Sequence, residues 1–425
     1  MSARGPVLSR RGGMVAVVSA ATAVIAGTGR ATARPAPPLG RDALQADVDA
    51  IRATGVTGVL AEVQGAHGRL RARAGAADLT GERPVPWDAY YRIGSDTKPF
   101  TATVVLQLAG EGRLGLNDTL DRWLPGLVDG HGNDGRRITL TNLLRHTSGL
   151  NDYVAVAGGA DDFTPEGYRE GRFRVTSARE QVAAAVSRPP LWLPDAADPA
   201  REQRWGYSNT NYVLLGLVVE KATGHPWAQE IHERVIAPLG LANTLVPGTS
   251  AYVPQPTATA YTQFPGSARL TDTSLATGGG ADGGIISTTH DLAVFLRALL
   301  GGRLLRRPQL AAMKQTVAAP DWIQVDGVRY GMGIAWRPGG GTSRGGGAGA
   351  GEPGSGEPGG GGAARRGDQG VWFHGGTHLG IVSESGVTAD GSRAATVAAF
   401  TLRTGERGDA QARAALRLVD RALRR

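Results

Sequence analysis

Residues 91–100 are Tyr91-Arg92-Ile93-Gly94-Ser95-Asp96-Thr97-Lys98-Pro99-Phe100, in which a serine and a lysine stand three residues apart just before a proline. Proline is tolerated in the first turn of a helix but not in its interior, so Pro99 predicts a helix that begins near Asp96. Ser95 then lies at the helix N-terminus, where free N–H groups and the helix dipole favour developing negative charge. Lys98 follows one turn later on the same face, where a neutral lysine can take the serine proton.

The Ser-x-x-Lys pair alone is weak evidence, because chance produces it in roughly 12% of chains with this few lysines. A second segment, Tyr207-Ser208-Asn209, could supply a phenol beside Lys98 and an amide beyond it. Residues i and i+2 of an extended loop face the same way, which would allow both contacts. Taken by itself, this segment favours a plain turn before a helix that starts near Tyr212.

A third segment, His374-Gly375-Gly376-Thr377, ends a predicted strand. Its glycines let a substrate backbone approach closely. A backbone N–H at this point could complete an oxyanion hole together with the N–H of Ser95. The three segments together indicate a serine nucleophile with proton carriers beside it.

In their order along the chain, these segments resemble the signature of penicillin-binding proteins and serine β-lactamases: Ser-x-x-Lys, then Ser/Tyr-x-Asn, then Lys-Thr-Gly on a strand. The likeness is greatest to serine D-alanyl-D-alanine carboxypeptidases that use Tyr-x-Asn, with class C β-lactamases and related esterases nearby. It runs from about residue 45 to the C-terminus, except for a Gly-rich tract. Further phrases of the same kind occupy residues 143–150, 207–212, 238–241, 283–288 and 330–333.

By this resemblance, Ser95 is the acylated nucleophile, and Lys98 and Tyr207 share the general-base and general-acid work. We expect nearby cations to lower the pKa of Tyr207 and burial to lower the pKa of Lys98. An acid limb in the pH–rate profile should then vanish or move in Tyr207→Phe. The resemblance also implies substrate binding by Asn209, which would hold the acyl amide.

Two residues of the third segment complete the implied substrate-binding set, namely His374 and Thr377, whose N–H would share the oxyanion with that of Ser95. The sequence departs from the family pattern between them, because Gly375 stands where threonine is expected. The threonine hydroxyl normally helps to bind a substrate carboxylate, so its loss weakens the carboxypeptidase interpretation and strengthens esterase or amidase alternatives. Three arginines could replace it with a bidentate grip: Arg337, Arg365 and Arg366.

The predicted fold is α/β, of the α+β type. An antiparallel sheet is built from both chain ends and flanked by helices, with an inserted all-helical lobe at about residues 99–325, as in β-lactamases and transpeptidases. The last helix is expected to present Ala412, Ala415, Leu416, Val419 and Leu423 on one apolar face. Strands are predicted at 58–63, 70–74, 330–336, 371–374, 381–387 and 394–401.

The chain also divides by composition. Residues 1–33 have the arginines, the apolar run and the small-residue cleavage site of an export signal, which predicts a secreted or extracytoplasmic protein. A linker at 34–44 and a serine hydrolase domain at 45–425 follow, with no integral membrane span once the signal is removed. Residues 339–362 hold 14 glycines in 24 positions and form a low-complexity insert.

Composition excludes several classes of function. The 425-residue chain has no cysteine, so disulfides, thiolate metal sites and cysteine nucleophiles are impossible. The net charge of +8 falls to +4 without residues 1–33 and forms no basic stripe, which argues against nucleic-acid partners. Ser343 stands in a Gly-x-Ser-x-Gly match, but the match lies inside the low-complexity insert, which argues against a nucleophile there. His374 and His378 have no evident carboxylate partner, which argues against a zinc site. We therefore predict no metal and no cofactor.

The sequence thus predicts an exported serine hydrolase that works through an acyl-enzyme. Its favoured substrates are peptidoglycan-like acyl-D-alanyl peptides or β-lactams. Small esters or D-amino-acid amides, hydrolysed on the same scaffold, are the alternative within enzymes. A non-catalytic penicillin-binding-like protein is the alternative outside them.

Overall fold

The computed structural model describes residues 40–158, 163–320, 322–323, 325–339 and 370–424. The predicted export signal and nearly all of the Gly-rich insert lie outside these residues. The described residues belong to the compact unit that starts at Pro38.

The centre of this unit is an eight-stranded sheet in which every neighbouring pair is antiparallel, in the order β2-β1-β14-β13-β12-β11-β10-β9. Strands from the start of the chain pair with strands from its end, since Glu62 lies opposite Thr396. The predicted sheet built from both chain ends is therefore confirmed. Its strands are β1 (Gly58–Gly65), β2 (Gly68–Gly75), β9 (Val317–Ala318), β10 (Arg329–Tyr330), β11 (Ala335–Arg337), β12 (Val371–His378), β13 (Ile381–Val387) and β14 (Ala394–Ala399).

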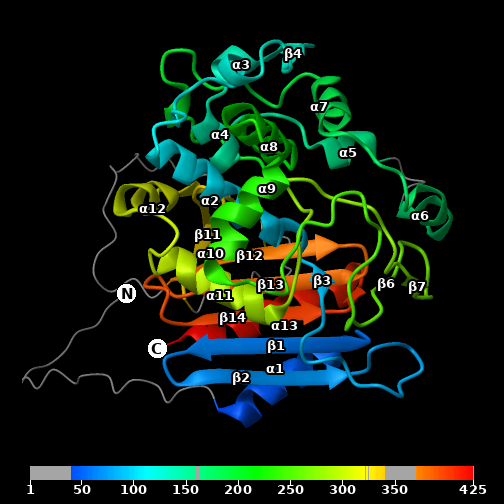
Figure 1. Cartoon of the computed structure of the whole chain (residues 1–425). Coiled ribbons are helices and arrows are strands. Elements are labelled where there is room, and N and C mark those ends of the chain that lie inside the picture. The colour runs from blue at the N-terminus through cyan, green and yellow to red at the C-terminus, as the bar shows by residue number, and fades with distance from the viewer. Residues whose placement is uncertain (1–39, 159–162, 321, 324, 340–369, 425) are drawn as a thin grey trace, which may run out of the picture. The chain divides into compact units, whose positions relative to one another are not determined.

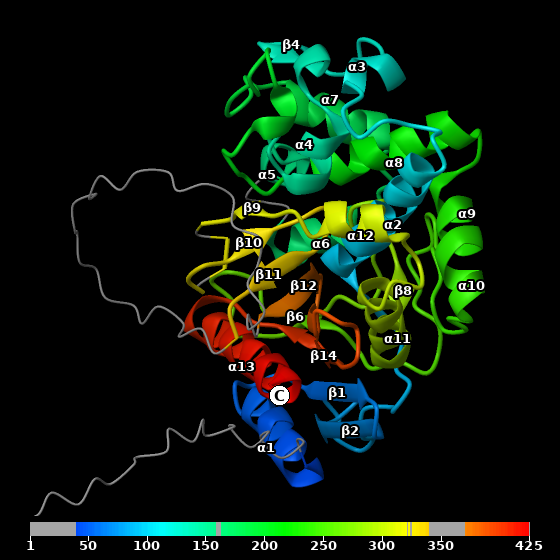
Figure 2. The same cartoon turned by 90° about the vertical axis from the view of Figure 1, so that its left-hand side faces the viewer.

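Helices cover both faces of the sheet (Figure 2). On one face, α1 (Arg41–Arg52) packs beside the closing helix α13 (Gly405–Leu423), and both bury apolar residues at helical spacing. On the other face, α11 (Thr289–Leu300) crosses β1, β13 and β14. Helix α1 begins inside the segment 34–44 that was interpreted as a linker. Leu44, Val48 and Ile51 at i, i+4 and i+7 explain its helical form.

Above α2 (Thr97–Gly110) in the view of Figure 1 lie α3 (Leu120–Trp123), α4 (Leu140–Arg145), α5 (Tyr153–Ala157), α7 (Ala178–Val186) and α8 (Thr210–Thr223). The remaining helices are α6 (Pro165–Gly171), α9 (Trp227–Ile231), α10 (Ala237–Leu239) and α12 (Arg307–Met313). Shorter helical turns are η1 (Gly94–Asp96), η2 (Gly135–Arg137), η4 (Pro199–Arg201) and the π-helical η5 (His232–Ile236).

The segment 99–325 is not all helical, contrary to the prediction. It contributes α11 to one face of the main sheet, β9 to the edge of that sheet, and several further two-residue strands. Strands β4 (Asp129–Gly130) and β5 (Asn133–Asp134) pair with each other, and β8 (Ile286–Ser287) pairs with β3 (Tyr91–Arg92), which precedes the segment. Strand β6 (Tyr261–Thr262) lies between β7 (Thr271–Asp272) and β15 (Thr401–Leu402), which follows the segment.

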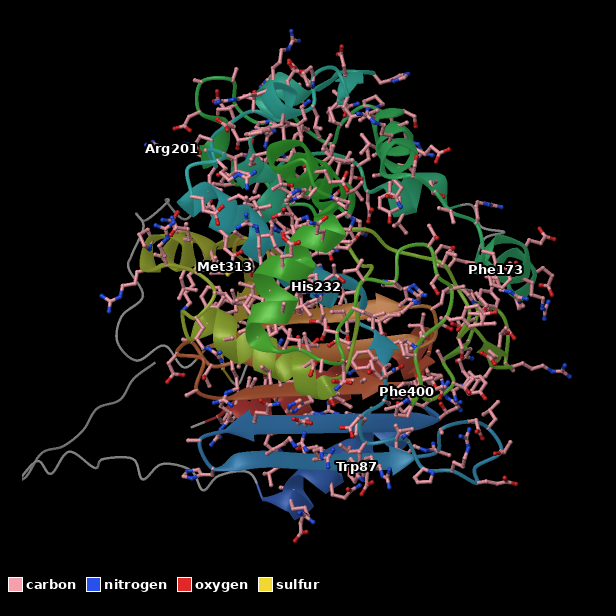
Figure 3. All side chains as sticks on the ribbon, in the orientation of Figure 1. Trp87, Phe173, Arg201, His232, Met313 and Phe400 are labelled. Carbon is pink, nitrogen blue, oxygen red and sulfur yellow. The ribbon has the colours of Figure 1, made fainter. Side chains whose placement is uncertain are left out.

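Helix α2 positions the site, because it lies between the sheet side and the helical lobe and is buried along most of its length. Phe100 of α2 stacks on Phe295 of α11, with ring centroids 3.6 Å apart. Contrasting positions are labelled in Figure 3, where the buried Phe400 lies beside the sheet and the exposed Phe173 lies at the outer edge near α6. Because α2 is packed from both sides, its first turn has little freedom to move.

Candidate active site

Ser95 lies in the middle of the 3₁₀ turn η1, which leads directly into α2. The helix therefore begins where Pro99 predicted, and Lys98 is in its first turn. The Nζ of Lys98 lies 3.1 Å from the Oγ of Ser95, and the hydroxyl of Tyr207 lies 2.9 Å from the same atom. The structure thus brings the three predicted catalytic residues together within hydrogen-bonding distance.

Lys98 is completely buried, and its Nζ has two further acceptors. It donates to the Oδ1 of Asn209 at 2.7 Å and to the backbone carbonyl of Asp282 at 2.8 Å. The amide of Asn209 is held in this orientation because its Nδ2 donates to Asp152 at 2.9 Å. When Lys98 is neutral, its lone pair must therefore face Ser95, since the other two partners are acceptors with no proton to give.

Burial also lowers the pKa of Lys98 to about 8, although the nearby carboxylates of Asp282, Asp152 and Asp96 oppose this shift. A lysine with this pKa is partly neutral near physiological pH, whereas an ordinary lysine is almost fully protonated. The geometry and the pKa agree that Lys98 can act as the general base for Ser95.

Tyr207 is held between rings, since it stacks on Trp322 at 5.5 Å and on His146 at 4.4 Å between centroids. Burial raises the pKa of Tyr207 well above its ordinary value, and the hydrogen bond to Ser95 only partly offsets this. The prediction that nearby cations lower this pKa is therefore wrong, even though Lys98 lies 4.9 Å from the ring centroid. Tyr207 stays a phenol at neutral pH and can donate its proton rather than take one.

Glycines allow strand β12 to lie directly against the start of α2. A Cβ on Gly376 would lie 1.8 Å from the carbonyl oxygen of Ile93. A Cβ on Gly94, whose φ is +53°, would lie 2.9 Å from the backbone nitrogen of Thr377. This contact brings Thr377 to the same cavity as Ser95. The role of its N–H as second oxyanion donor stays a prediction, and such close backbone packing is what that role requires.

Asp96, the last residue of the turn η1, connects this turn to strand β13 by hydrogen bonds. Its carboxylate accepts hydrogen bonds from Ser383 at 2.8 Å and Ser385 at 2.5 Å. Burial raises the pKa of Asp96 to about 7, because the two serine bonds compensate only part of the lost hydration. The residue beside the nucleophile therefore holds Ser95 in register with the sheet.

His374 is placed differently from the other predicted site residues. It is fully buried, with its Nε2 at 3.0 Å from the hydroxyl of Tyr330 and its Nδ1 at 2.7 Å from the carbonyl oxygen of Gly375. Burial lowers the pKa of His374 to about 3, so the ring is neutral. This arrangement ties β12 to β10, whereas direct contact of the ring with substrate stays a prediction. In the described part of the chain, no group of three or more His, Asp or Glu side chains could hold a metal ion.

The cavity beside Ser95 has a volume of about 520 Å³. Tyr207, Asn209 and Trp322 line it together with residues 375–377 of β12 and parts of β13 and α13. Arg337, one of the arginines predicted to grip a substrate carboxylate, is fully buried and already paired with Glu384 and Asp420. The other two candidates, Arg365 and Arg366, lie outside the described residues.

The model of the beta-lactamase family matches residues 41–421 of this sequence. The chain belongs to the beta-lactamase family. The family resemblance found in the motifs and the predicted fold class are both confirmed. The family contains hydrolases of several kinds, so membership alone does not name a substrate.

Among solved structures, this beta-lactamase-family protein is similar to a D-stereospecific amidohydrolase from a Streptomyces species. The two share 35% sequence identity over 85% of this chain and 94% of the other, with a TM-score of 0.71. It is also similar to a penicillin-binding protein of Bacillus subtilis, at 32% identity over 40% of this chain and 34% of the relative. Esterase EstB of Burkholderia gladioli is 35% identical over 41% and 43% of the two chains. The chain spans less than half the length of these last two relatives.

Several functional residues of the beta-lactamase-family site were not predicted from the sequence. Asp152, which orients Asn209, lies two residues after the end of the family phrase at 143–150, so its position was a usable signal. Asp282, which supplies a carbonyl to Lys98, comes just before the phrase at 283–288. Trp322 and Glu384 stand in segments without a motif, and only packing brings them to the cavity.

We expect the kcat/KM of the enzyme to rise with pH through a midpoint near 8. Below that pH, Lys98 is protonated and cannot take the proton of Ser95, so the rate should fall about tenfold per pH unit. In Tyr207→Phe the rate should fall by about 10²-fold or more while the midpoint stays, because Tyr207 remains a phenol throughout this range. Rates of ester hydrolysis between about pH 5 and pH 10 measure both. If the pH midpoint near 8 disappears in Tyr207→Phe, the general base is Tyr207 and not Lys98.

Proposed function

We propose that this protein is an amidase or esterase that acts on D-amino-acid derivatives through an acyl-enzyme on Ser95. The observation that carries the proposal is the Oγ of Ser95, which faces a cavity with Lys98 Nζ at 3.1 Å and the Tyr207 hydroxyl at 2.9 Å. A protein that only binds cell-wall fragments has no need for two proton carriers at one serine. The geometry therefore favours catalysis over the non-catalytic alternative.

Acylation starts when neutral Lys98 takes the proton of Ser95. The Oγ then forms a bond to the substrate carbonyl carbon, and the π electrons of the carbonyl move onto its oxygen. The N–H groups of Ser95 and Thr377 donate hydrogen bonds to the resulting oxyanion. The intermediate collapses with cleavage of the C–N or C–O bond, and the proton on Lys98 reaches the leaving group by way of the Tyr207 hydroxyl. In deacylation, water takes the place of Ser95 as nucleophile and attacks the ester carbonyl by the same steps. The C–O bond to Ser95 breaks, which releases the carboxylic acid and restores the serine hydroxyl.

Amide or ester substrates without a terminal carboxylate fit the cavity better than D-alanyl-D-alanine peptides do. Gly375 provides no hydroxyl for such a carboxylate, and the guanidinium of Arg337 is taken by Glu384 at 2.8 Å and Asp420 at 2.9 Å. The similarity to the Streptomyces D-stereospecific amidohydrolase, over nearly the full length of that protein, supports the same substrate class.

The second candidate is the D-alanyl-D-alanine carboxypeptidase or β-lactamase activity that the motifs favoured. Its support is the 32% identity to the Bacillus subtilis penicillin-binding protein, together with the Tyr-x-Asn element. Benzylpenicillin separates it from the first candidate. A long-lived penicilloyl adduct in an intact-protein mass spectrum would support a peptidase, and rapid hydrolysis of the drug would support a β-lactamase.

We expect the purified protein to hydrolyse an acyl-D-alanyl-D-alanine peptide amide at least about tenfold faster, in kcat/KM, than the same peptide with a free C-terminal carboxylate. The reason is that Gly375 offers no hydroxyl to a substrate carboxylate, which meets the carboxylate of Glu384 at that position instead. Chromatographic quantification of both products measures the ratio, and the peptide with L-alanine at the scissile bond tests stereospecificity. A preference for the free acid would decide for the carboxypeptidase.

Export is a further part of the proposal, and it is supported by the signal-like pattern of residues 1–33. Within the described ranges, no helix is long and apolar enough to cross a membrane. Detection of the protein outside the cytoplasm, with an N-terminus near Ala33, would support export.

A further inference from the structure

A buried charge cluster lies next to the catalytic cavity and has no part in the mechanism above. Arg337 of β11 is fully buried and stacks over the ring of Phe373 at 4.1 Å. Its Nη1 donates to the Oε1 of Glu384 on β13 at 2.8 Å, and its Nε donates to the Oδ1 of Asp420 on α13 at 3.0 Å. One cation thus faces two carboxylates.

The two carboxylates differ in where they point. Glu384 lines the same cavity as Ser95, whereas Asp420 lies behind Arg337 on α13. The Oε1 of Glu384 accepts a hydrogen bond from Arg337, and the Glu384 side chain is 12% exposed. Its second oxygen, Oε2, is the atom that lies toward Gly375. Glu384 therefore offers the cavity a carboxylate oxygen that the cluster does not use.

Gly375 makes room for this oxygen. The register of β12 and β13 places Gly375 directly opposite Glu384, and a Cβ on Gly375 would lie only 2.8 Å from Oε2. A threonine at this position would push the carboxylate away and present a hydroxyl donor instead. Where a threonine would present a hydrogen-bond donor to the cavity, Gly375 and Glu384 together present a charged acceptor.

The local charge is negative when all three groups are ionised, because one guanidinium is shared by two carboxylates. Asp409 and Arg413 of α13 also line the cavity, and their opposite charges leave this balance unchanged. Burial raises the pKa of Glu384 to about 7, although Arg337 opposes the shift, so the carboxylate is mostly ionised at pH 8. A positively charged group is the partner that such an environment stabilises most.

We infer that Glu384 determines specificity by binding a primary ammonium group of the substrate through its Oε2. The inference rests on the amidase or esterase function proposed for Ser95. The ammonium can belong to the acyl half of the substrate, as a free α-amine, or to the leaving half, as an amine on the group that departs. Both sources present the same chemistry to Glu384, and matched substrates distinguish them.

Two substrate pairs test the inference in the full-length protein at about pH 7.5, where Glu384 is mostly ionised and an α-amine is still substantially protonated. The first pair is D-phenylalanine p-nitroanilide and its N-acetyl derivative, of which only the first has an α-amine that can carry a charge. The second pair is the N-acetyl-D-phenylalanine amides of 1,2-diaminoethane and of propylamine, which differ in the charge of the leaving half. We expect the wild type to prefer the charged member of one pair by about tenfold to hundredfold in kcat/KM.

In Glu384→Gln this preference should fall toward a ratio of one. Asp420→Asn is the matched control, because it removes a carboxylate from the same Arg337 at a point outside the cavity, and it should keep the preference. Gly375→Ala is a second test that leaves every charge in place. Its methyl group should displace Oε2 and reduce the preference as well. Thermal unfolding of all variants verifies that they are folded.

The pair whose ratio responds to Glu384→Gln identifies the half of the substrate that carries the ammonium. Unchanged ratios in both pairs, or equal losses on charged and neutral members, would overturn the inference and leave the hydrolase function standing. Equal losses in Asp420→Asn and Glu384→Gln would overturn it too, because they would indicate a purely structural cluster. Hydrolysis of none of the four amides by the wild type would instead reject the proposed function and this inference together.

Discussion

Replacement of Ser95 by alanine is expected to lower kcat/KM for ester and amide substrates by about 10⁴-fold or more. The Oγ of Ser95 is the atom that both Lys98 and Tyr207 approach, at 3.1 and 2.9 Å. Without it, the cavity can still bind and polarise a substrate, but no covalent intermediate can form. The measurements are initial rates with a chromogenic ester and the intact-protein mass after mixing with a slow acylating substrate. The adduct should form on the wild type and be absent from Ser95→Ala.

Ser343→Ala is the matched control for this experiment. Ser343 stands in the Gly-x-Ser-x-Gly match of the low-complexity insert, which is the pattern of a different class of serine hydrolase. Its replacement should leave both the rate and the adduct as in the wild type. An adduct on Ser95→Ala that is lost in Ser343→Ala would move the nucleophile out of the site described above.

Replacement of Lys98 by methionine is expected to lower kcat/KM by about 10²- to 10⁴-fold. Methionine has a similar length and keeps the buried position filled, but it has no lone pair strong enough to take the proton of Ser95. The variant should remain folded. The hydrogen bonds lost by Asn209 and Asp282 destabilise it, whereas removal of a buried charge relieves a desolvation penalty.

The pH–rate profile, the rate of a control variant and the rate of acyl-enzyme formation check this second prediction. The acid limb near pH 8 should be lost from the residual activity, because Lys98 is the group assigned to it. Lys221→Met makes the same change at an exposed position on α8 and should leave the rate unaltered. A Lys98→Met enzyme with wild-type rates of acyl-enzyme formation would contradict the general-base role.

Much of the site was accessible from the sequence because its central features are local. Ser95 and Lys98 lie one helical turn apart, so their contact follows from the start of α2, which Pro99 marks. Most of the main strands were predicted near their observed positions, among them β1, β2 and β13. The single strand predicted at 330–336 was wrong, because this segment forms the two short antiparallel strands β10 and β11. Helix α1 was missed although Leu44, Val48 and Ile51 carried the helical period, because the prolines before it favoured a linker.

Other features had no local signature. The orientation of Asn209 depends on Asp152, and the pKa of Tyr207 depends on rings from distant segments, among them Trp322 and His146. The motif alone placed Tyr207 near a cation and predicted a lowered pKa. Burial has the larger effect and the opposite sign, and burial is a property of packing that no single segment contains.

The sequence by itself determined the family and the sheet shared by the two chain ends, and it predicted Ser95 as the nucleophile with Lys98 beside it, since these depend on motifs and short spacings. Only the tertiary structure decided the environment of position 375. The sequence revealed a missing threonine, and Arg337 was one candidate to replace it. The register of β12 with β13 and the packing of α13 instead placed Glu384 in that space and Asp420 behind it. Charges so far apart in the chain interact only after strand pairing and helix packing have brought them within a few ångströms.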